Sequence, residues 1–62
     1  MAIFTKNQRT QIRVEKTEFK GHEYLHIREW WTDGGQWKPG KGIALPVGMA
    51  KEILEAAMKE VA

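Results

Sequence analysis

Three tryptophans lie within eight residues of this 62-residue chain, at positions 30, 31 and 37. They stand among four glycines and the cations Lys38 and Lys41, in the stretch EWWTDGGQWKPGKGI. An exposed indole ring can stack on a nucleobase, and a nearby lysine can pair with a phosphate. Tryptophans in small domains more often fill a core. Because these tryptophans are interleaved with lysine and glycine, both a binding role and a role in the core stay open.

Positive charge is concentrated in the same part of the chain as the aromatic rings. Residues 1–42 contain eight Lys and Arg against five Asp and Glu, whereas residues 43–62 contain two against three. Cations and rings together favour a nucleic-acid surface. A mixed surface that serves only solubility is the alternative.

The short length of the chain limits its own core. A domain of this size buries only about 60% of its unfolded surface, so it usually needs a disulfide, a metal or a partner subunit. The chain has no cysteine, which excludes disulfides and favours an intracellular protein. No stretch resembles a membrane span or a secretory signal. We therefore expect a homodimer in the cytoplasm or nucleoid of a bacterium or a virus-infected cell.

The sequence shows none of the residue arrangements that are typical of catalytic sites. There is no Ser/His/Asp arrangement, no paired carboxylate and no nucleotide-binding motif, so we expect no enzyme activity and no cofactor. His22 and His26 are too few for a metal site, and we expect none.

Hydrophobic alternation predicts the strands. Residues 1–10 are predicted as a flexible N-terminal arm, and residues 11–62 as one domain. Alternation from Gln11 to Phe19 and again through EYLHIREWW indicates a hairpin around Lys20-Gly21. The glycine turn after Asp33 and the Pro39-Gly40 turn then predict two further short strands, the second with Ile43 and Leu45 facing inward.

A helix is predicted after these strands. Pro46 suits a first helical position, and apolar residues recur at helical spacing up to Val61. No side chain is available to cap its start, so packing must hold it. The predicted fold class is α+β, a four-stranded antiparallel sheet followed by one C-terminal amphipathic helix.

These motifs resemble a known family. The segments FKG, HIREWW and KPGKGIALP, followed by a terminal helix, are similar to the single-stranded-DNA-binding domain of the transcriptional coactivator family called positive cofactor four, or p15. The similarity runs from about Val14 to Leu45 and suggests a minimal bacterial or viral form. The family implies a curved sheet with a helix behind it, in a homodimer.

The resemblance also implies roles for individual residues. Phe19 and Trp31 match stacking aromatics, and the cations match residues that contact the DNA backbone. His22 matches a position that is often basic in the family, and Lys16 is adjacent to a second such position, Thr17. The role of Trp30 stays open between this surface and the interior of the sheet or dimer. The candidate DNA-binding residues are therefore Lys16, Phe19, Lys20, His22, Arg28, Trp30, Trp31, Lys38 and Lys41.

Two functions remain open. The first is sequence-independent binding of single-stranded DNA by a homodimer that could hold both strands of a melted duplex, in transcription, replication, recombination or repair. Its further partners would be proteins of these processes. The second is a protein-interaction module, in which a sheet edge or the aromatic surface takes up a peptide and affinity for DNA is low.

Overall fold

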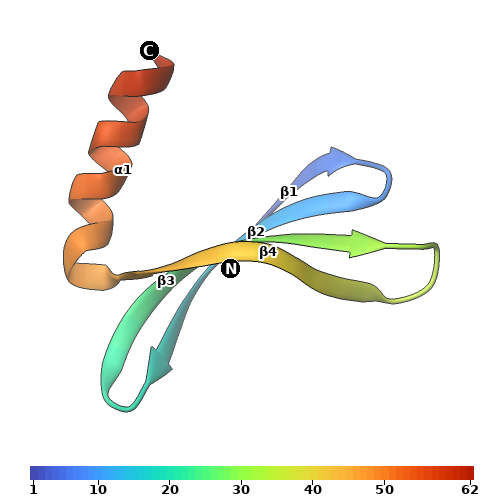
Figure 1. Cartoon of the computed structure of the whole chain (residues 1–62), viewed down its shortest axis with the longest axis horizontal. Helices are drawn as coiled ribbons and strands as arrows, with labels where there is room; N and C mark the ends of the chain where they lie inside the picture. The colour runs from blue at the N-terminus through green and yellow to red at the C-terminus, as the bar shows by residue number, and fades with distance from the viewer.

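The computed structural model describes all 62 residues as an antiparallel sheet with one helix. The strands pair in the order in which they occur in the sequence, and the helix follows the last of them (Figure 1). The predicted fold class is confirmed. The elements are β1 (Ala2–Asn7), β2 (Thr10–Phe19), β3 (His22–Thr32), β4 (Trp37–Pro46) and α1 (Val47–Val61).

The N-terminal segment is a strand, and the prediction of a flexible arm over residues 1–10 is wrong. Ala2 pairs with Val14, and Phe4 pairs with Ile12, so β1 forms an edge of the sheet. The edge of β2 supplies hydrogen-bond partners for the backbone N–H and C=O groups of β1. The same residues would lack these partners as an isolated segment. The adjacent apolar residues Ile3 and Phe4 obscured the alternation in the sequence.

The two short strands predicted after Asp33 are one continuous strand, β4. Pro39 is tolerated because β4 is an edge strand, where a missing N–H breaks no ladder. The register with β3 shifts between Arg28 and Trp30, which indicates a β-bulge that absorbs one extra residue of β4. The Pro39-Gly40 signal therefore marks a bulge within a strand.

A two-residue turn joins β2 to β3, as predicted. Lys20 has φ of 52° and Gly21 has φ of 80°. Positive φ at both central residues is the backbone of a type I′ turn, whose twist matches that of the flanking strands. The turn fixes the direct pairing of Phe19 with His22.

The helix begins directly after the edge strand. Pro46 occupies the N-cap position, so the helix begins one residue later than predicted. It makes no side-chain capping bond, and the predicted lack of a cap is confirmed. Figure 1 shows α1 extending away from the sheet, so in the single chain it does not cover the sheet as the resemblance implied. Ala50 is the only buried residue, at 6% exposure.

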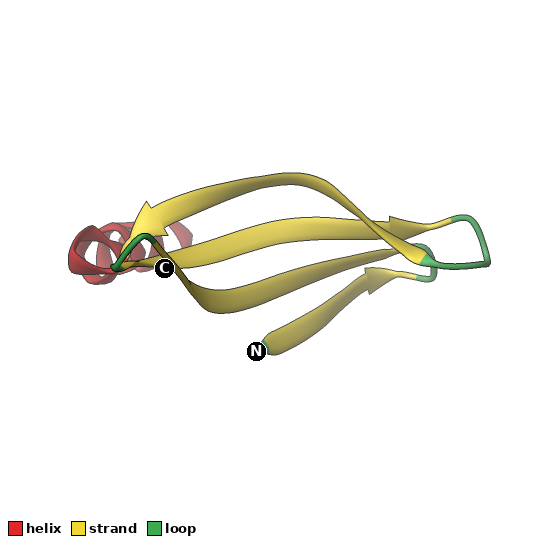
Figure 2. Ribbon diagram, turned by 90° about the horizontal axis from the view of Figure 1, so that it is seen from below, coloured by secondary structure: helices red, strands yellow, loops and turns green.

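The sheet is bowed, and the molecule is open in shape. Figure 2 shows the bowed strands from the side, with α1 at one end of the sheet. The radius of gyration is 13.2 Å, against about 10.6 Å for a compact domain of this length. The helix is not long and apolar enough to cross a membrane.

Candidate nucleic-acid interface

The two faces of the sheet differ in chemistry. Successive residues of a strand point to opposite faces, and directly paired residues share a face. One face, the aromatic face, carries on its strands Arg13, Phe19, Tyr24, His26, Arg28, Trp30 and Trp37. The other, the apolar face, carries Phe4, Ile12, Val14, Leu25, Ile27, Ile43 and Leu45.

An arginine lies between two tryptophans on the aromatic face. The guanidinium carbon of Arg13 is 4.2 Å from the ring centre of Trp30 and 5.9 Å from that of Trp37. Its Nε and Nη2 donate to Oε1 of Gln11, over 3.2 and 3.1 Å. Both tryptophans are half-buried, so this cluster stiffens the sheet and leaves other N–H groups of Arg13 free.

A second arginine lies directly opposite the first. Arg28 pairs with Arg13 across β2 and β3, and its Nη1 donates to the Gly40 carbonyl oxygen over 2.8 Å. Gly42 makes room for it, because a Cβ there would lie 2.8 Å from the Arg28 Cβ. Like charges placed directly opposite destabilise a sheet unless an anion compensates them.

No carboxylate compensates these two arginines. The ion pairs of the chain are Lys6 with Glu29 and Lys16 with Glu23, both on the other face. The aromatic face therefore carries unpaired positive charge beside rings, which is the composition that binds a nucleic-acid strand.

The turn between β2 and β3 adds an open ring and more charge. The Phe19 side chain is 64% exposed, and Lys20 Nζ is 5.4 Å from its ring centre. His22, directly paired with Phe19, is exposed on the same face. Three of the predicted DNA-binding residues thus gather at one end of the sheet.

The remaining predicted residues lie on the other face. Trp31 is 41% exposed, and Lys38 Nζ lies 5.2 Å from its ring centre. Lys41 is also exposed, near the middle of the sheet, and Lys16 is held by Glu23 over 3.1 Å. Trp31 and Phe19 are separated by about 30 Å along the strand direction, judged from nine strand steps. One chain therefore does not bring these two exposed rings together.

Comparison with known proteins identifies the family. A model of the family "Transcriptional Coactivator p15 (PC4)" matches residues 6–56, which include all nine predicted DNA-binding residues. The chain belongs to this family. The resemblance seen in the sequence is thereby confirmed.

Individual relatives agree with the p15 (PC4) assignment. An RNA polymerase II transcriptional coactivator of Drosophila melanogaster is 44% identical over 48 residues, which are 76% of this chain and 42% of the relative. The chain thus spans about two fifths of that protein.

Solved structures of p15 (PC4) homologues share the fold. One from Burkholderia pseudomallei superposes with a TM-score of 0.87 at 19% identity, covering 98% of this chain and 85% of its own. A bacteriophage T5 homologue superposes with a TM-score of 0.74 at 27% identity, covering 97% and 72%. That phage protein is implicated in recombination-dependent DNA replication.

Some residues of the interface were not among the predicted p15-type contacts. Arg13 and Tyr24 share the face of Arg28 but are not among the nine predicted residues. Alternation along β3 is enough to put Tyr24, His26, Arg28 and Trp30 on one face. Only the pairing register reveals that Arg13 joins them, opposite Arg28.

Proposed function

We propose that this chain binds single-stranded DNA independently of sequence, as a homodimer, in transcription, replication, recombination or repair. It does so without catalysis or a cofactor. The proposed contacts are the predicted residues Lys16, Phe19, Lys20, His22, Arg28, Trp30, Trp31, Lys38 and Lys41, joined by Arg13.

The observation that carries this proposal is the unpaired arginine pair on the aromatic face. Arg13 and Arg28 are directly opposite each other, flanked by Trp30, and their hydrogen-bond acceptors are neutral. Phosphates of a strand would neutralise both cations, and its bases would meet the rings. Half-buried cations are positioned in advance, so less side-chain freedom is lost when a strand binds.

Dimerisation is supported by the surface that the single chain exposes. Its accessible area is 5291 Å², against about 4,100 Å² expected for a compact monomer of 7.2 kDa. The excess of about 1,200 Å² for each chain is in the range of a permanent interface between two subunits. The aliphatic side chains of the apolar face and the side of α1 with Met49, Ile53 and Leu54 are the proposed surfaces for a second copy. Trp31 and its partner Lys38 lie beyond these side chains, at the end of the apolar face beside the β3–β4 turn, and stay available for a strand.

A dimer would carry two copies of each proposed contact. It could hold two strands at once, as in a melted duplex, and so favour strand opening or annealing without ATP. The phage homologue implicated in recombination-dependent replication and the Drosophila coactivator support a role with nucleic acid. Proteins of those processes are the proposed further partners, inside the cell.

The test is a fluorescence-anisotropy titration of a labelled strand of ~20 nucleotides and of the matching duplex, at several salt concentrations. The proposal predicts clear preference for the single strand, with affinity that falls steeply as salt rises. Weak, equal binding of both would contradict it. That result would favour the protein-interaction module instead, since β1 and β4 leave both edges of the sheet open to a peptide strand.

A further inference from the structure

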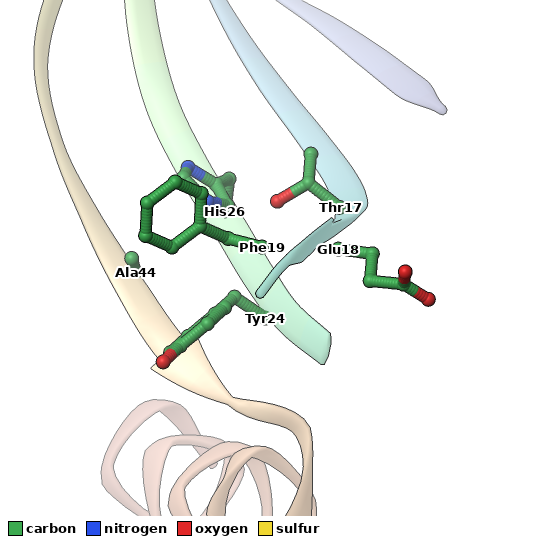
Figure 3. A pocket seen from close by; sticks show the side chains of 6 residues that line it. All are labelled: Thr17, Glu18, Phe19, Tyr24, His26 and Ala44. Carbon is green, nitrogen blue, oxygen red and sulfur yellow. The ribbon is translucent and has the colours of Figure 1, made fainter. Parts of the chain in front are cut away.

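A pocket opens on the aromatic face beside the β2–β3 turn. Its volume is about 380 Å³, and it is lined by Thr17, Glu18, Phe19, Tyr24, His26 and Ala44. Figure 3 shows the Phe19 and Tyr24 rings at this opening, with the Thr17 hydroxyl on the pocket side and the Glu18 carboxylate turned away. The lining thus combines flat rings with small polar groups.

The polar groups of the pocket have no partner within the chain. Neither the Thr17 hydroxyl, the Tyr24 hydroxyl nor the His26 ring takes part in any of the side-chain hydrogen bonds of the molecule. Each of the two hydroxyls can donate and accept, and a neutral imidazole offers one donor and one acceptor. A ligand that covered these groups would have to satisfy them, because an unsatisfied polar group costs affinity.

We propose that this pocket receives one unstacked nucleobase and makes the affinity for a strand depend on its base composition. The flat face of the base lies on the Phe19 ring, and its polar edge meets Thr17, Tyr24 and His26. Sequence order stays unread, because one such pocket examines one base at a time. The inference rests on the proposed binding of single-stranded DNA and adds a specific base site to it.

Charge around the pocket favours a base that is attached to phosphates. Lys20 Nζ is 5.4 Å from the Phe19 ring centre, and Arg28 follows His26 by two residues on the same face. These cations lie on two sides of the opening, where the phosphates before and after an inserted base would run. Glu15, opposite His26, is exposed and could accept a bond from a base amino group.

The first test compares base preference in matched variants. The dissociation constants of oligo-dT and oligo-dA are measured for the wild-type chain, Tyr24→Phe, Thr17→Val and Thr5→Val. Thr5 lies on the same face but outside the pocket, so Thr5→Val is the control. The ratio of the two constants should shift by roughly fivefold in the pocket variants, as expected for one hydrogen bond, and should stay constant in the control.

The outcomes separate this inference from the proposed function. An unchanged ratio in both pocket variants, with strand binding intact, overturns the base pocket alone. Failure of the wild-type chain to bind any single strand overturns the proposed function and the pocket together.

A second test needs no variant and so does not depend on folding of a mutant. A strand that carries 5-iododeoxyuridine is irradiated in complex with the wild-type chain, and the cross-linked residues are identified by mass spectrometry. Cross-links at Tyr24 or His26 support the pocket, and a cross-link at Phe19 without either of them contradicts it, because Phe19 is already a proposed contact. Cross-links confined to Trp31 or to other residues outside it contradict the proposal.

Discussion

The two faces of the sheet are built from the same strands, but they favour different environments, apolar for one face and anionic for the other. The apolar face carries aliphatic side chains that are only half-buried in the single chain, and Ile43 is 54% exposed. The aromatic face carries rings held by arginine and glutamine, with cations that lack carboxylate partners. The first face gains free energy when it is covered by apolar surface, whereas the second needs an anion. Alternation along a strand thus gives a chain of 62 residues two surfaces of different chemistry.

The largest effect is expected on dimerisation, when a negative charge is introduced on one face and, in a second variant, on the other face. Ile43→Glu would bury a carboxylate in the proposed dimer interface, which costs several kcal/mol. Dimerisation should weaken by more than about a hundredfold, as measured by sedimentation equilibrium. Ala44→Glu, one residue away on the aromatic face, is the matched control and should leave the dimer intact. If the two variants dimerise equally well, the proposed difference between the two faces is contradicted.

The next largest effect is expected on the affinity for a single strand, when the exposed ring of Trp31 is removed. Trp31→Ala should weaken single-strand binding by about 1–3 kcal/mol, because a stacking surface for one base is lost. The dimer should remain folded in circular dichroism, since the ring is 41% exposed in the chain. Unfolding of the variant would place this ring in a core or in the dimer interface, and would remove it from the binding surface.

The smallest effect concerns the salt dependence of binding. Arg28→Gln should reduce the slope of log affinity against log salt by about 0.7, the value for one phosphate contact on a single strand. Lys51→Gln, which removes an exposed charge from the helix, should leave the slope unchanged. If both variants lower the slope equally, general charge and not the aromatic face explains the attraction.

The sequence was sufficient for the strands that alternate clearly. β2 and β3, the Lys20-Gly21 turn and the uncapped helix were all predicted from local patterns. The edge strands were harder, because β1 depends on partners supplied by β2, and Pro39 is compatible with a strand only at an edge. Such elements are determined by tertiary pairing more than by their own residues.

The sequence was sufficient to predict which types of residue form the candidate site. It was less sufficient to predict where on the sheet each of them lies. Successive residues of a strand point to opposite faces, so alternation alone separates Trp30 from Trp31, and the register agrees with this. It could not show that Arg13 lies between Trp30 and Trp37, since these residues belong to three strands. The nine predicted residues also divide between the faces, which follows from pairing and not from spacing in the sequence.

The most direct test of the two-faced account uses the absence of cysteine from the chain. Single variants Ile43→Cys and Ala44→Cys are prepared, and the rate of thiol modification is measured with and without a single strand. The account predicts that Cys at position 43 reacts slowly in both conditions, covered by the second copy. At position 44 it predicts fast modification that becomes slow when the strand is added. Equal rates at both positions, or protection by the strand at position 43 alone, would contradict the account.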